Sequence, residues 1–394
     1  MNNRQLFFRH MGQTSQAPLA IEIERASGVY MYGPDGRQYL DLISGISVSN
    51  VGHCHPRVVA AVQKQAQTHM HLMVYGEFIQ GPQVELANLL CQNLPINLDS
   101  VYLVNSGSEA VEGALKLAKR FTGRSEIITF RNAYHGSTHG SLSVMGDEQM
   151  KNAFRPLLPH IRILEFNNQE QLEQISEKTA CVIVETIQGE AGVIVPCPTF
   201  FQKLRAKCNQ TGTLLILDEI QAGCGRTGKL WAFEHYGIMP DILTLAKGMG
   251  GGMPIGAFIA SNQIMQSLTH NPVLGHITTF GGNAVCAAAA KANLEVIITG
   301  RLWEHAEKSE KVFRGHLQHP AIRSIRGKGL LLALEFESFE QNKRIIDQLI
   351  EQGIVTDWFL FAPNCLRIAP PLTISEPQIV EACETITDVI DKNL

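Results

Sequence analysis

Short apolar runs alternate with amphipathic stretches along most of the chain, and this alternation predicts a sheet covered by helices. Two of the runs, residues 213–217 and 242–246, are bounded by polar residues and glycine, as is typical of parallel strands buried on both faces. In residues 110–119, alanine, valine and leucine recur along one stripe, which predicts a helix packed against such a sheet. Together the two patterns predict an α/β fold.

Further elements follow from the same patterns. Strands are predicted at residues 101–104, 127–130, 180–185, 255–261, 329–335 and 366–368, and helices at residues 56–69, 80–93, 284–298, 301–318, 339–352 and 376–392. Residues 29–41 predict a hairpin, because Pro34, Asp35 and Gly36 form a turn cluster between two short strands. A chain of 394 residues is long enough to bury a large core and to form two domains.

Two of the predicted strands each lead to one charged residue. The run 213–217 is followed by Asp218, and the run 242–246 is followed by Lys247. Because the carboxyl ends of parallel strands meet at one edge of a sheet, we expect these two side chains to lie there together. Pyridoxal phosphate needs a lysine that holds its aldehyde as a Schiff base and an acid beside its ring nitrogen. An ordinary ion pair that caps two strands is the structural alternative.

Two other motifs suggest nucleotide binding or metal binding, but neither is complete. Residues 223–229 read GCGRTGK and match a phosphate-binding P-loop, but Leu230 stands where such a loop needs Ser or Thr for Mg²⁺. A nucleotide-binding module is therefore the more distant alternative. His53, Cys54 and His55 lack a second cluster at zinc-ligand spacing, so we expect no metal site.

The segments around Asp218 and Lys247 also resemble a known family. They read LDEIQAGCGRTGK and TLAKGMGGGMPIGAF, which is similar to the signature of the class III pyridoxal-phosphate aminotransferases, the group of acetylornithine, ornithine and 4-aminobutyrate aminotransferases. With the motifs below, the resemblance extends from about residue 30 to residue 372. It implies that Asp218 pairs with the ring nitrogen, Ile220 lies against one ring face, Gln221 meets the phenolic oxygen and Lys247 carries the imine.

The resemblance also implies an architecture. Members of this family have the fold type I of pyridoxal-phosphate enzymes, with a large domain built on a mostly parallel seven-stranded sheet and a smaller α+β domain made from both chain ends. Here we expect residues 1–50 to form the N-terminal part of the small domain, residues 51–299 the large cofactor-binding domain and residues 300–394 the C-terminal small domain. Gly300 is the one hint of a boundary in the sequence.

Three further positions are expected to hold the cofactor. The turn NSGSEA opens the helix at residues 110–119, and free N–H groups at a helix start suit a phosphate. The resemblance assigns this contact to Gly107 and Ser108, whereas a plain N-cap by Ser106 or Ser108 is the structural alternative. Tyr134 is expected to stack on the ring, unless it only fills a gap in the core. Glu185 is expected in the hydrogen-bond network beside the cofactor.

The expected substrate residues come from the resemblance. Glu190 and Arg367 match a family pair in which the glutamate neutralises the arginine while an ω-amine binds and releases it to hold an α-carboxylate. A permanent salt bridge between two loops is the alternative. Tyr75 and Ser137 are also expected to contact substrate. Acetylornithine, ornithine and 4-aminobutyrate aminotransferases typically have arginine at the position of Ser137, and a hydroxyl cannot replace a bidentate guanidinium.

A second copy of the chain is also implied. The segment HITTFGGN resembles the family loop in which a threonine, here Thr279, reaches the cofactor phosphate of the partner subunit, so a homodimer with shared active sites is expected. The net charge of −4 and the pI near 6.4 give no reason to expect nucleic acid or a membrane surface as a partner. Nine cysteines without a CxxC pair indicate reduced thiols and a cytoplasmic location.

These observations predict an aminotransferase. The expected reaction moves an amino group from an ω-amino acid or a related amine to an α-keto acid. A racemase, epimerase or aminomutase on the same scaffold is the nearer alternative, because the same lysine and electron sink serve all of these reactions.

Overall fold

A seven-stranded sheet forms the centre of the computed structural model, which describes residues 1–393. Its strands lie in the order β4-β10-β9-β8-β7-β5-β6. Their bounds are β4 Ser100–Val104, β5 Glu126–Phe130, β6 Ile161–Leu164, β7 Thr179–Glu185, β8 Leu214–Asp218, β9 Ile242–Leu245 and β10 Gly256–Ala260. Only β10 runs antiparallel to its neighbours in this sheet. The predicted mostly parallel seven-stranded sheet is therefore confirmed.

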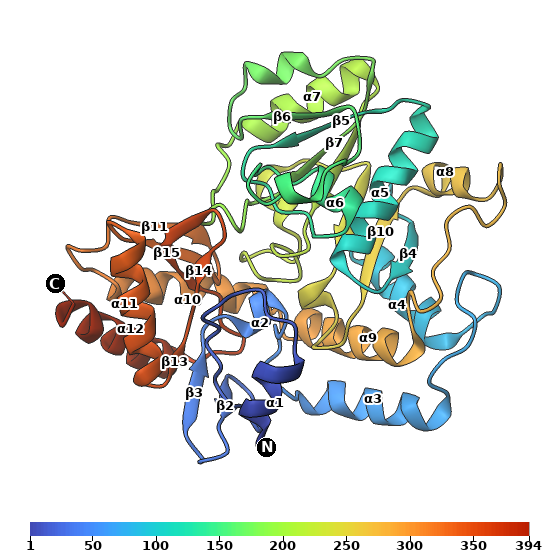
Figure 1. Cartoon of the computed structure of the whole chain (residues 1–394). Coiled ribbons are helices and arrows are strands. Elements are labelled where there is room, and N and C mark those ends of the chain that lie inside the picture. The colour runs from blue at the N-terminus through green and yellow to red at the C-terminus, as the bar shows by residue number, and fades with distance from the viewer. Residues whose placement is uncertain (394) are drawn as a thin grey trace.

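Helices bury both faces of this sheet, as Figure 1 shows. Alternate residues of β7 enter different clusters: Val182 and Val184 join one, while Cys181 and Ile183 join the other. Helix α5 (Gly107–Thr122) packs on the face of Ile183. The opposite face is covered by α7 (Phe200–Thr211) and by a layer formed by α3 (Pro56–Thr68), α4 (Gly81–Gln92) and α9 (Ala284–Thr299).

A second hydrophobic core joins the two ends of the chain. Strands β11 (Ser324–Lys328), β12 (Leu331–Glu335), β15 (Ala362–Ile368) and β14 (Trp358–Phe359) form an antiparallel sheet, next to α10 (Leu302–His316), α11 (Phe339–Glu351) and α12 (Glu376–Asp391). Strand β13 (Ile354–Val355) pairs in parallel with β3 (Gln38–Asp41). Val29, Leu40 and Leu42 share one apolar cluster with residues of α10 to α12, so the blue and red segments of Figure 1 pack together. The domain boundaries at residues 50 and 299 remain a proposal.

Some elements differ from the sequence prediction. The hairpin is present as β2 (Tyr30–Tyr32) and β3, with β1 (Arg25–Ser27) added to it. The run 255–261 does form β10, but antiparallel, since an apolar run contains no signal for the direction of a strand. Helix α7 and strands β6 and β11 were not predicted. Strands β6 and β11 lie at sheet edges and are only partly buried, which weakens their apolar pattern.

None of the helices within residues 1–393 is long and apolar enough to cross a membrane.

Candidate active site

A cavity of about 390 Å³ lies at the carboxyl ends of the parallel strands. This volume is within the usual range for small-molecule sites. Loops from β4, β5, β7, β8 and β9 supply its walls. It brings together many of the predicted residues, namely Gly107, Ser108, Tyr134, Glu185, Glu190, Asp218, Ile220, Gln221 and Lys247.

Asp218 ends β8 and is held by two hydrogen bonds. Its Oδ2 lies 2.7 Å from Nδ1 of His135, and its Oδ1 accepts a hydrogen bond from the Ile220 N–H at 3.0 Å. Both Asp218 and His135 are buried, and Nε2 of His135 has no partner among the described residues. His135 therefore orients the carboxylate. Sequence reasoning missed His135, and its only signal was its position directly after Tyr134.

Lys247 follows β9 and begins the 3₁₀ turn η4 (Lys247–Met249) with a left-handed φ of 42°. Its Nζ forms neither a hydrogen bond nor an ion pair within residues 1–393. Burial lowers the pKa of Lys247, and the nearby Glu190 carboxylate offsets this effect only in part. A lysine in this state is a nucleophile and a base, because more of it is present as the free amine.

The start of α5 offers an anion site. Ser106 is the N-cap, since its Oγ accepts from the Glu109 N–H at 3.2 Å, and this leaves Gly107 and the Ser108 hydroxyl facing the cavity. A Cβ on Gly136 would lie 2.2 Å from Oγ of Ser108. The loop after β5 therefore approaches this turn at a distance that only glycine permits. Free N–H groups and the helix dipole favour a phosphate here.

Glu185 links two walls of the cavity. Its Oε1 accepts from the Tyr134 N–H at 3.0 Å, and its Oε2 accepts from the Gly189 N–H at 2.9 Å. Burial raises the pKa of Glu185 to about 7, although the two N–H donors act against this shift. Glu185 thereby fixes the loop that carries Tyr134.

These groups fit pyridoxal phosphate. Lys247 could receive its aldehyde, Asp218 its ring nitrogen and the start of α5 its phosphate. Tyr134 and Ile220 could receive the two faces of the ring. The buried Oε1 of Gln221 has no partner among residues 1–393, as expected for a group that meets a bound molecule.

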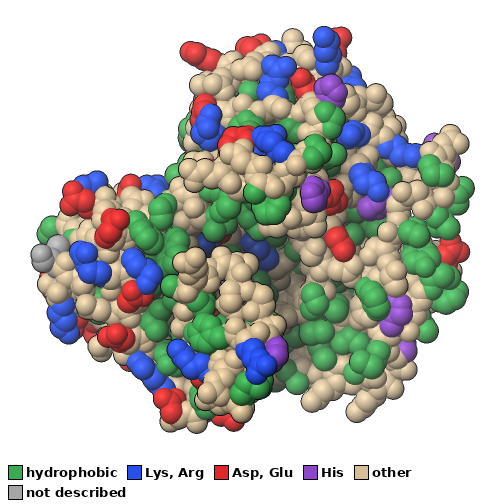
Figure 2. Space-filling model, in the orientation of Figure 1, with side chains coloured by type: hydrophobic (Ala, Val, Ile, Leu, Met, Phe, Trp, Pro, Cys, Tyr) green, Lys and Arg blue, Asp and Glu red, His purple; other side chains and the backbone are tan. Residues whose placement is uncertain are grey.

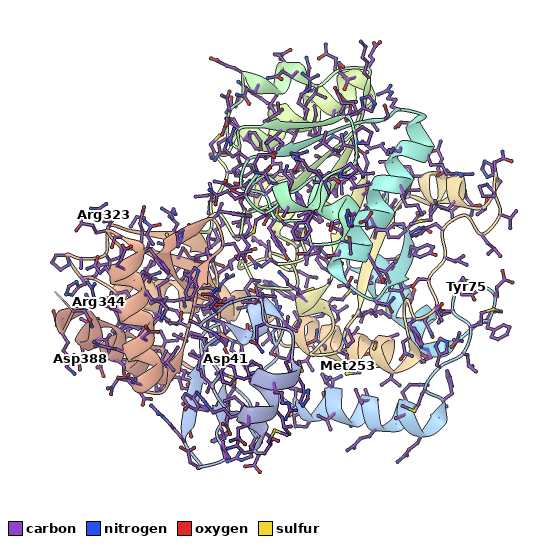
Figure 3. All side chains as sticks on the ribbon, viewed as in Figure 1. Asp41, Tyr75, Met253, Arg323, Arg344 and Asp388 are labelled. Atoms are coloured by element: carbon purple, nitrogen blue, oxygen red, sulfur yellow. The ribbon has the colours of Figure 1, made fainter. Side chains whose placement is uncertain are left out.

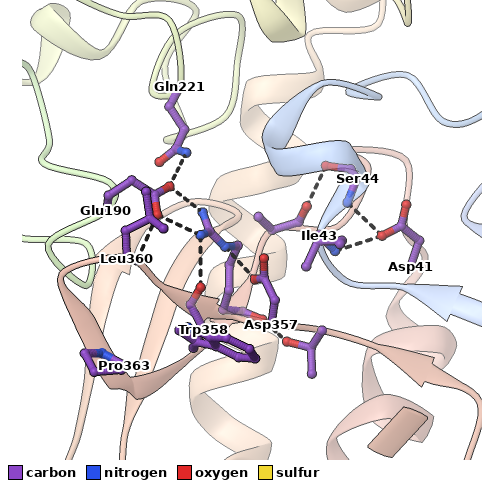
Figure 4. A network of polar contacts seen from close by, with 12 residues as sticks. Asp41, Ile43, Ser44, Glu190, Gln221, Asp357, Trp358, Leu360 and Pro363 are labelled. Carbon is purple, nitrogen blue, oxygen red and sulfur yellow. Dashed lines mark hydrogen bonds and ion pairs between the residues drawn. The ribbon is translucent and has the colours of Figure 1, made fainter. Parts of the chain in front are cut away.

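Glu190 and Arg367 form a buried bidentate ion pair beside this cavity, drawn in Figure 4. Nη1 and Nη2 of Arg367 lie 3.0 Å from Oε1 and Oε2 of Glu190, and Nε lies 2.7 Å from Oδ1 of Asp357. Burial alone would raise the pKa of Glu190, but Arg367 outweighs it and lowers the pKa to about 2. Gln221 and the Leu360 N–H also donate to Glu190, at 3.1 and 3.2 Å. Arg367 is neutralised in this arrangement.

Three predicted residues lie outside the cavity wall. Ser137 is exposed at the rim, and its Oγ lies 3.2 Å from the Tyr134 hydroxyl. Tyr75 lines a separate cavity with Thr278, and Figure 3 shows Tyr75 well away from Met253, which lines the cofactor cavity. Thr279 is exposed and does not line the cofactor cavity of its own chain. Neither Tyr75 nor Thr279 lines the cofactor cavity of its own chain.

The P-loop alternative does not fit the structure. No helix of the required kind opens after residues 223–229, because a short 3₁₀ helix, η3 (Ala232–Tyr236), follows them. Arg226 in this segment is buried and donates to the carbonyl groups of Leu330 and Pro370 instead of facing a ligand.

Among residues 1–393 no group of three metal-binding side chains occurs, and His53 pairs with Asp41 at 2.8 Å.

The fold and the site together define a pyridoxal-phosphate-dependent transferase. The sequence model for the class-III aminotransferases matches residues 11–390, and the chain belongs to that family, which makes it a transaminase. The acetylornithine aminotransferase of Bacillus cereus is 40% identical over 376 residues, which cover 94% of this chain and 95% of that protein. The crystal structure of ornithine aminotransferase from Toxoplasma gondii has a TM-score of 0.92 at 30% identity and covers 100% of this chain and 96% of that one. A transaminase from Virgibacillus has a TM-score of 0.92 at 25% identity, covering 99% and 98%.

Proposed function

We propose that this transaminase takes its amino group from an ω-amino acid or a related amine of the acetylornithine, ornithine or 4-aminobutyrate kind and passes it to an α-keto acid. The observation that carries the proposal is the Glu190–Arg367 pair beside Lys247. Such a pair lets one site receive a donor that has no carboxylate next to its amine and an acceptor that has one. The names of the similar proteins support this donor class.

The side chains of the cavity divide the work of the reaction. When bound, pyridoxal phosphate supplies an electron sink for the bond that breaks at the amine-bearing carbon. Lys247, with its lowered pKa, is the base that removes and returns the proton at that carbon. Asp218 would hold the ring nitrogen, and His135 keeps its carboxylate in place. Gly107 and Ser108 would hold the phosphate.

Arg367 would bind the acceptor. Its guanidinium is held on two sides, by Glu190 and by Asp357, and it lies over the Phe359 ring at 4.2 Å. When the α-carboxylate of a keto acid replaces Glu190, the bidentate geometry is kept and Asp357 still fixes the guanidinium. Glu190 would pair with Arg367 again when the ω-amine donor enters.

The rim of the cavity determines which amino-group donors the enzyme accepts. Ser137 stands where the family pattern has arginine, and it offers a neutral hydroxyl 3.2 Å from the Tyr134 hydroxyl. A donor with a carboxylate at its far end would meet no fixed cation at this point. We therefore include amines without a far carboxylate in the donor class.

The test of this function is an assay of the purified enzyme loaded with pyridoxal phosphate, using a panel of amines and ω-amino acids with pyruvate and 2-oxoglutarate. We expect transfer to at least one acceptor, and its loss in Lys247→Ala with the fold retained by circular dichroism. Borohydride treatment of the loaded enzyme should label the peptide that contains Lys247. Labelling of another lysine, or unchanged turnover in the variant, would overturn the proposal.

The rim assignment has its own test. Ser137→Arg should raise kcat/KM for donors with a far carboxylate by about tenfold, which corresponds to about 1.4 kcal/mol for one charge-assisted contact. The same variant should leave kcat/KM for uncharged amines nearly unchanged. His139→Arg, at an exposed position two residues further along the chain, at the start of helix α6 (His139–Ser143), serves as the matched control. An equal change for both donor types would contradict the assignment.

We further propose that the chain forms a homodimer with shared active sites. Two segments, residues 70–79 and 273–280, carry an exposed apolar face. It is formed by Met70, Leu72, Phe78, Ile79, Val273, Leu274, Ile277 and Phe280. The His71 and Phe280 rings lie 4.6 Å apart, and Asn283 donates to the Met70 carbonyl at 2.9 Å, so the segments form one surface. Figure 2 shows green side chains along this right-hand edge of the molecule. Thr279 lies within the face, next to Phe280, and Tyr75 lies in the first of the two segments.

The proposal includes a cytoplasmic location, since nine free thiols suit a reducing compartment. Cell fractionation with detection of the native protein would test it.

A further inference from the structure

A second large cavity, of about 930 Å³, opens at the other edge of the seven-stranded sheet. The C-terminal end of α5, the amino ends of β5, β6 and β7 and the loop before residue 276 form its walls. The cofactor cavity lies at the opposite end of the same helix, where Gly107 begins α5. The 16 residues of α5 span about 24 Å, so the two cavities are separate sites.

The walls of this second cavity are strongly cationic. Five lysine and arginine side chains line it, three from α5 and two from segments outside that helix, together with two histidines and one carboxylate, that of Glu126. The basic residues are Lys116, Lys119, Arg120, Arg124 and Lys178. Figure 2 shows blue and purple side chains gathered on the part of this face where Figure 1 places α5 and α8 (Asn262–Met265). The whole protein carries a net charge of −4, so this concentration is local.

The two arginines of this cavity are held by neutral backbone groups. Nη1 of Arg124 donates to the carbonyl oxygens of Thr211 and Thr179 at 3.0 and 3.1 Å. Nε of Arg120 donates to the Ser267 carbonyl at 2.6 Å. These contacts hold each guanidinium in place without an opposite charge. The remaining N–H groups of both side chains need other partners.

The charges of the three lysines are also not balanced by a carboxylate partner among the described residues. Within residues 1–393, no carboxylate lies in ion-pair distance of Lys116, Lys119 or Lys178. Nζ of Lys116 lies 2.9 Å from a ring nitrogen, Nδ1 of His276. The carboxylate of Glu126 is already taken, because it pairs with Arg162 at 3.0 Å and accepts from the Thr179 hydroxyl at 2.7 Å.

The end of a helix explains only part of this cluster. Lys119 and Arg120 lie in the last turn of α5, where the helix dipole favours cations. Arg124 lies beyond the helix, and Lys178 comes from the segment before β7, so the dipole does not account for them. Like charges that converge without a counter-charge repel one another, and an anion between them removes this repulsion.

We infer that this cavity binds a compact polyanion, a small molecule with at least two phosphate or carboxylate groups. Two fixed guanidinium groups suit the planar recognition of such groups, and the lysines add flexible point charges. The five basic side chains gather around one cavity, which favours a small molecule over a nucleic acid strand, because such a strand needs an extended basic stripe. The site is independent of the proposed transamination, and its ligand does not reach the cofactor.

Titration calorimetry of the enzyme loaded with pyridoxal phosphate tests this inference. Inorganic pyrophosphate is the first probe. Citrate is the second probe and shows whether the cavity prefers phosphate or carboxylate groups. The binding of both is measured at low and high salt. We expect saturable binding of one probe molecule per subunit that weakens as salt rises. The double variant Lys119→Ala/Lys178→Ala should weaken binding by at least about tenfold, while its transaminase activity is measured separately.

The control removes the same charge elsewhere. Lys203 and Lys308 are exposed and lie away from the cavity, so Lys203→Ala/Lys308→Ala should bind the probe as the wild type does. The absence of saturable binding of both probes would overturn the inference. Equal weakening in the two double variants would also overturn it, because the effect would then come from net charge alone. Either result would leave the transaminase proposal untouched.

Discussion

At the scale of single residues, the Glu190–Arg367 pair places two opposite charges in the protein interior beside the cofactor cavity. Both side chains are almost fully buried, and each would be costly to bury alone. Burial alone would lower the pKa of Arg367, but Glu190 and Asp357 outweigh it and raise the pKa. The pair is therefore stable as a pair, and the acceptor carboxylate that we propose for this site would restore the same charge if it replaced Glu190.

This pair predicts how stability depends on pH. The pKa of Glu190 is about 2 in the folded protein and 4.5 in the unfolded chain. A lowered carboxyl pKa stabilises the fold fully above about pH 4.5, and the contribution is lost as pH falls toward 2. Glu190→Gln should therefore reduce the free energy of unfolding by about 3 kcal/mol at neutral pH. The same variant should also lose less stability than the wild type as pH falls below about 4.5. Urea midpoints measured between pH 7 and pH 3 would show both effects.

The control for this prediction is an exposed pair of the same residue types. Arg323 and Glu337 lie 2.9 Å apart at the surface, where solvent screens their attraction. Glu337→Gln should leave the urea midpoint nearly unchanged. A loss in Glu190→Gln no larger than that in Glu337→Gln would show that the buried pair does not contribute in this way.

At the scale of elements, the turn after β8 connects the two hydrophobic cores. Arg226, in the middle of GCGRTGK, is completely buried, and burial lowers its pKa to about 9. Its Nη1 donates to the carbonyl groups of Leu330 and Pro370, and its Nη2 lies 2.5 Å from Oδ1 of Asn50. One guanidinium thus binds two backbone carbonyl groups of the C-terminal part of the chain and a side-chain amide of the N-terminal part.

Removal of Arg226 should be costly. Arg226→Met replaces the guanidinium side chain with an apolar side chain of similar length, and it leaves the two carbonyl groups unpaired in the interior. We expect a loss of about 3 kcal/mol or more in stability, measured as a lower urea midpoint or melting temperature. Arg314 also donates to two carbonyl groups, those of Ile325 and Gly327, but it is partly exposed. Arg314→Met should cost only about 1 kcal/mol, because water can replace its hydrogen bonds; similar losses in both variants would contradict the role of burial.

At the scale of the whole molecule, the apolar face exposes eight large hydrophobic side chains on two neighbouring segments. Ile79 is 96% exposed and Val273 is 72% exposed. Exposed apolar surfaces of this kind mark interaction sites in soluble proteins. Because Thr279 lies in this face, a second copy that covers it would also bring Thr279 toward another active site.

The dimer can be tested by disruption and by complementation. Phe280→Glu should yield a monomer in light scattering and lose activity, because a charge is then buried in the interface. Mixing Lys247→Ala with Thr279→Ala subunits should restore activity, up to about a quarter of the sites with random pairing, since each mixed dimer has one intact site. A dimeric and active Phe280→Glu variant would refute the assigned face. An absence of complementation would show that Thr279 does not act across subunits.

Much of the fold and the site could be predicted from local patterns. The buried strands were found because each is a short apolar run, and Asp218 and Lys247 were found because they follow two such runs. His135 was missed, because a loop histidine has no periodic pattern to place it beside Asp218. Tyr75 was expected near the substrate, but only the structure shows that it lies away from the cofactor cavity of its own chain.

Local chemistry thus determined which residues could react, because strand ends, glycine turns and helix starts are properties of short segments. Only the tertiary structure decided which of those segments meet. The contact between Glu190 and Arg367, the reach of Arg226 across both cores and the convergence of cations around the second cavity all join positions far apart in the chain. Such contacts depend on how the layers pack, and no short stretch of sequence specifies that.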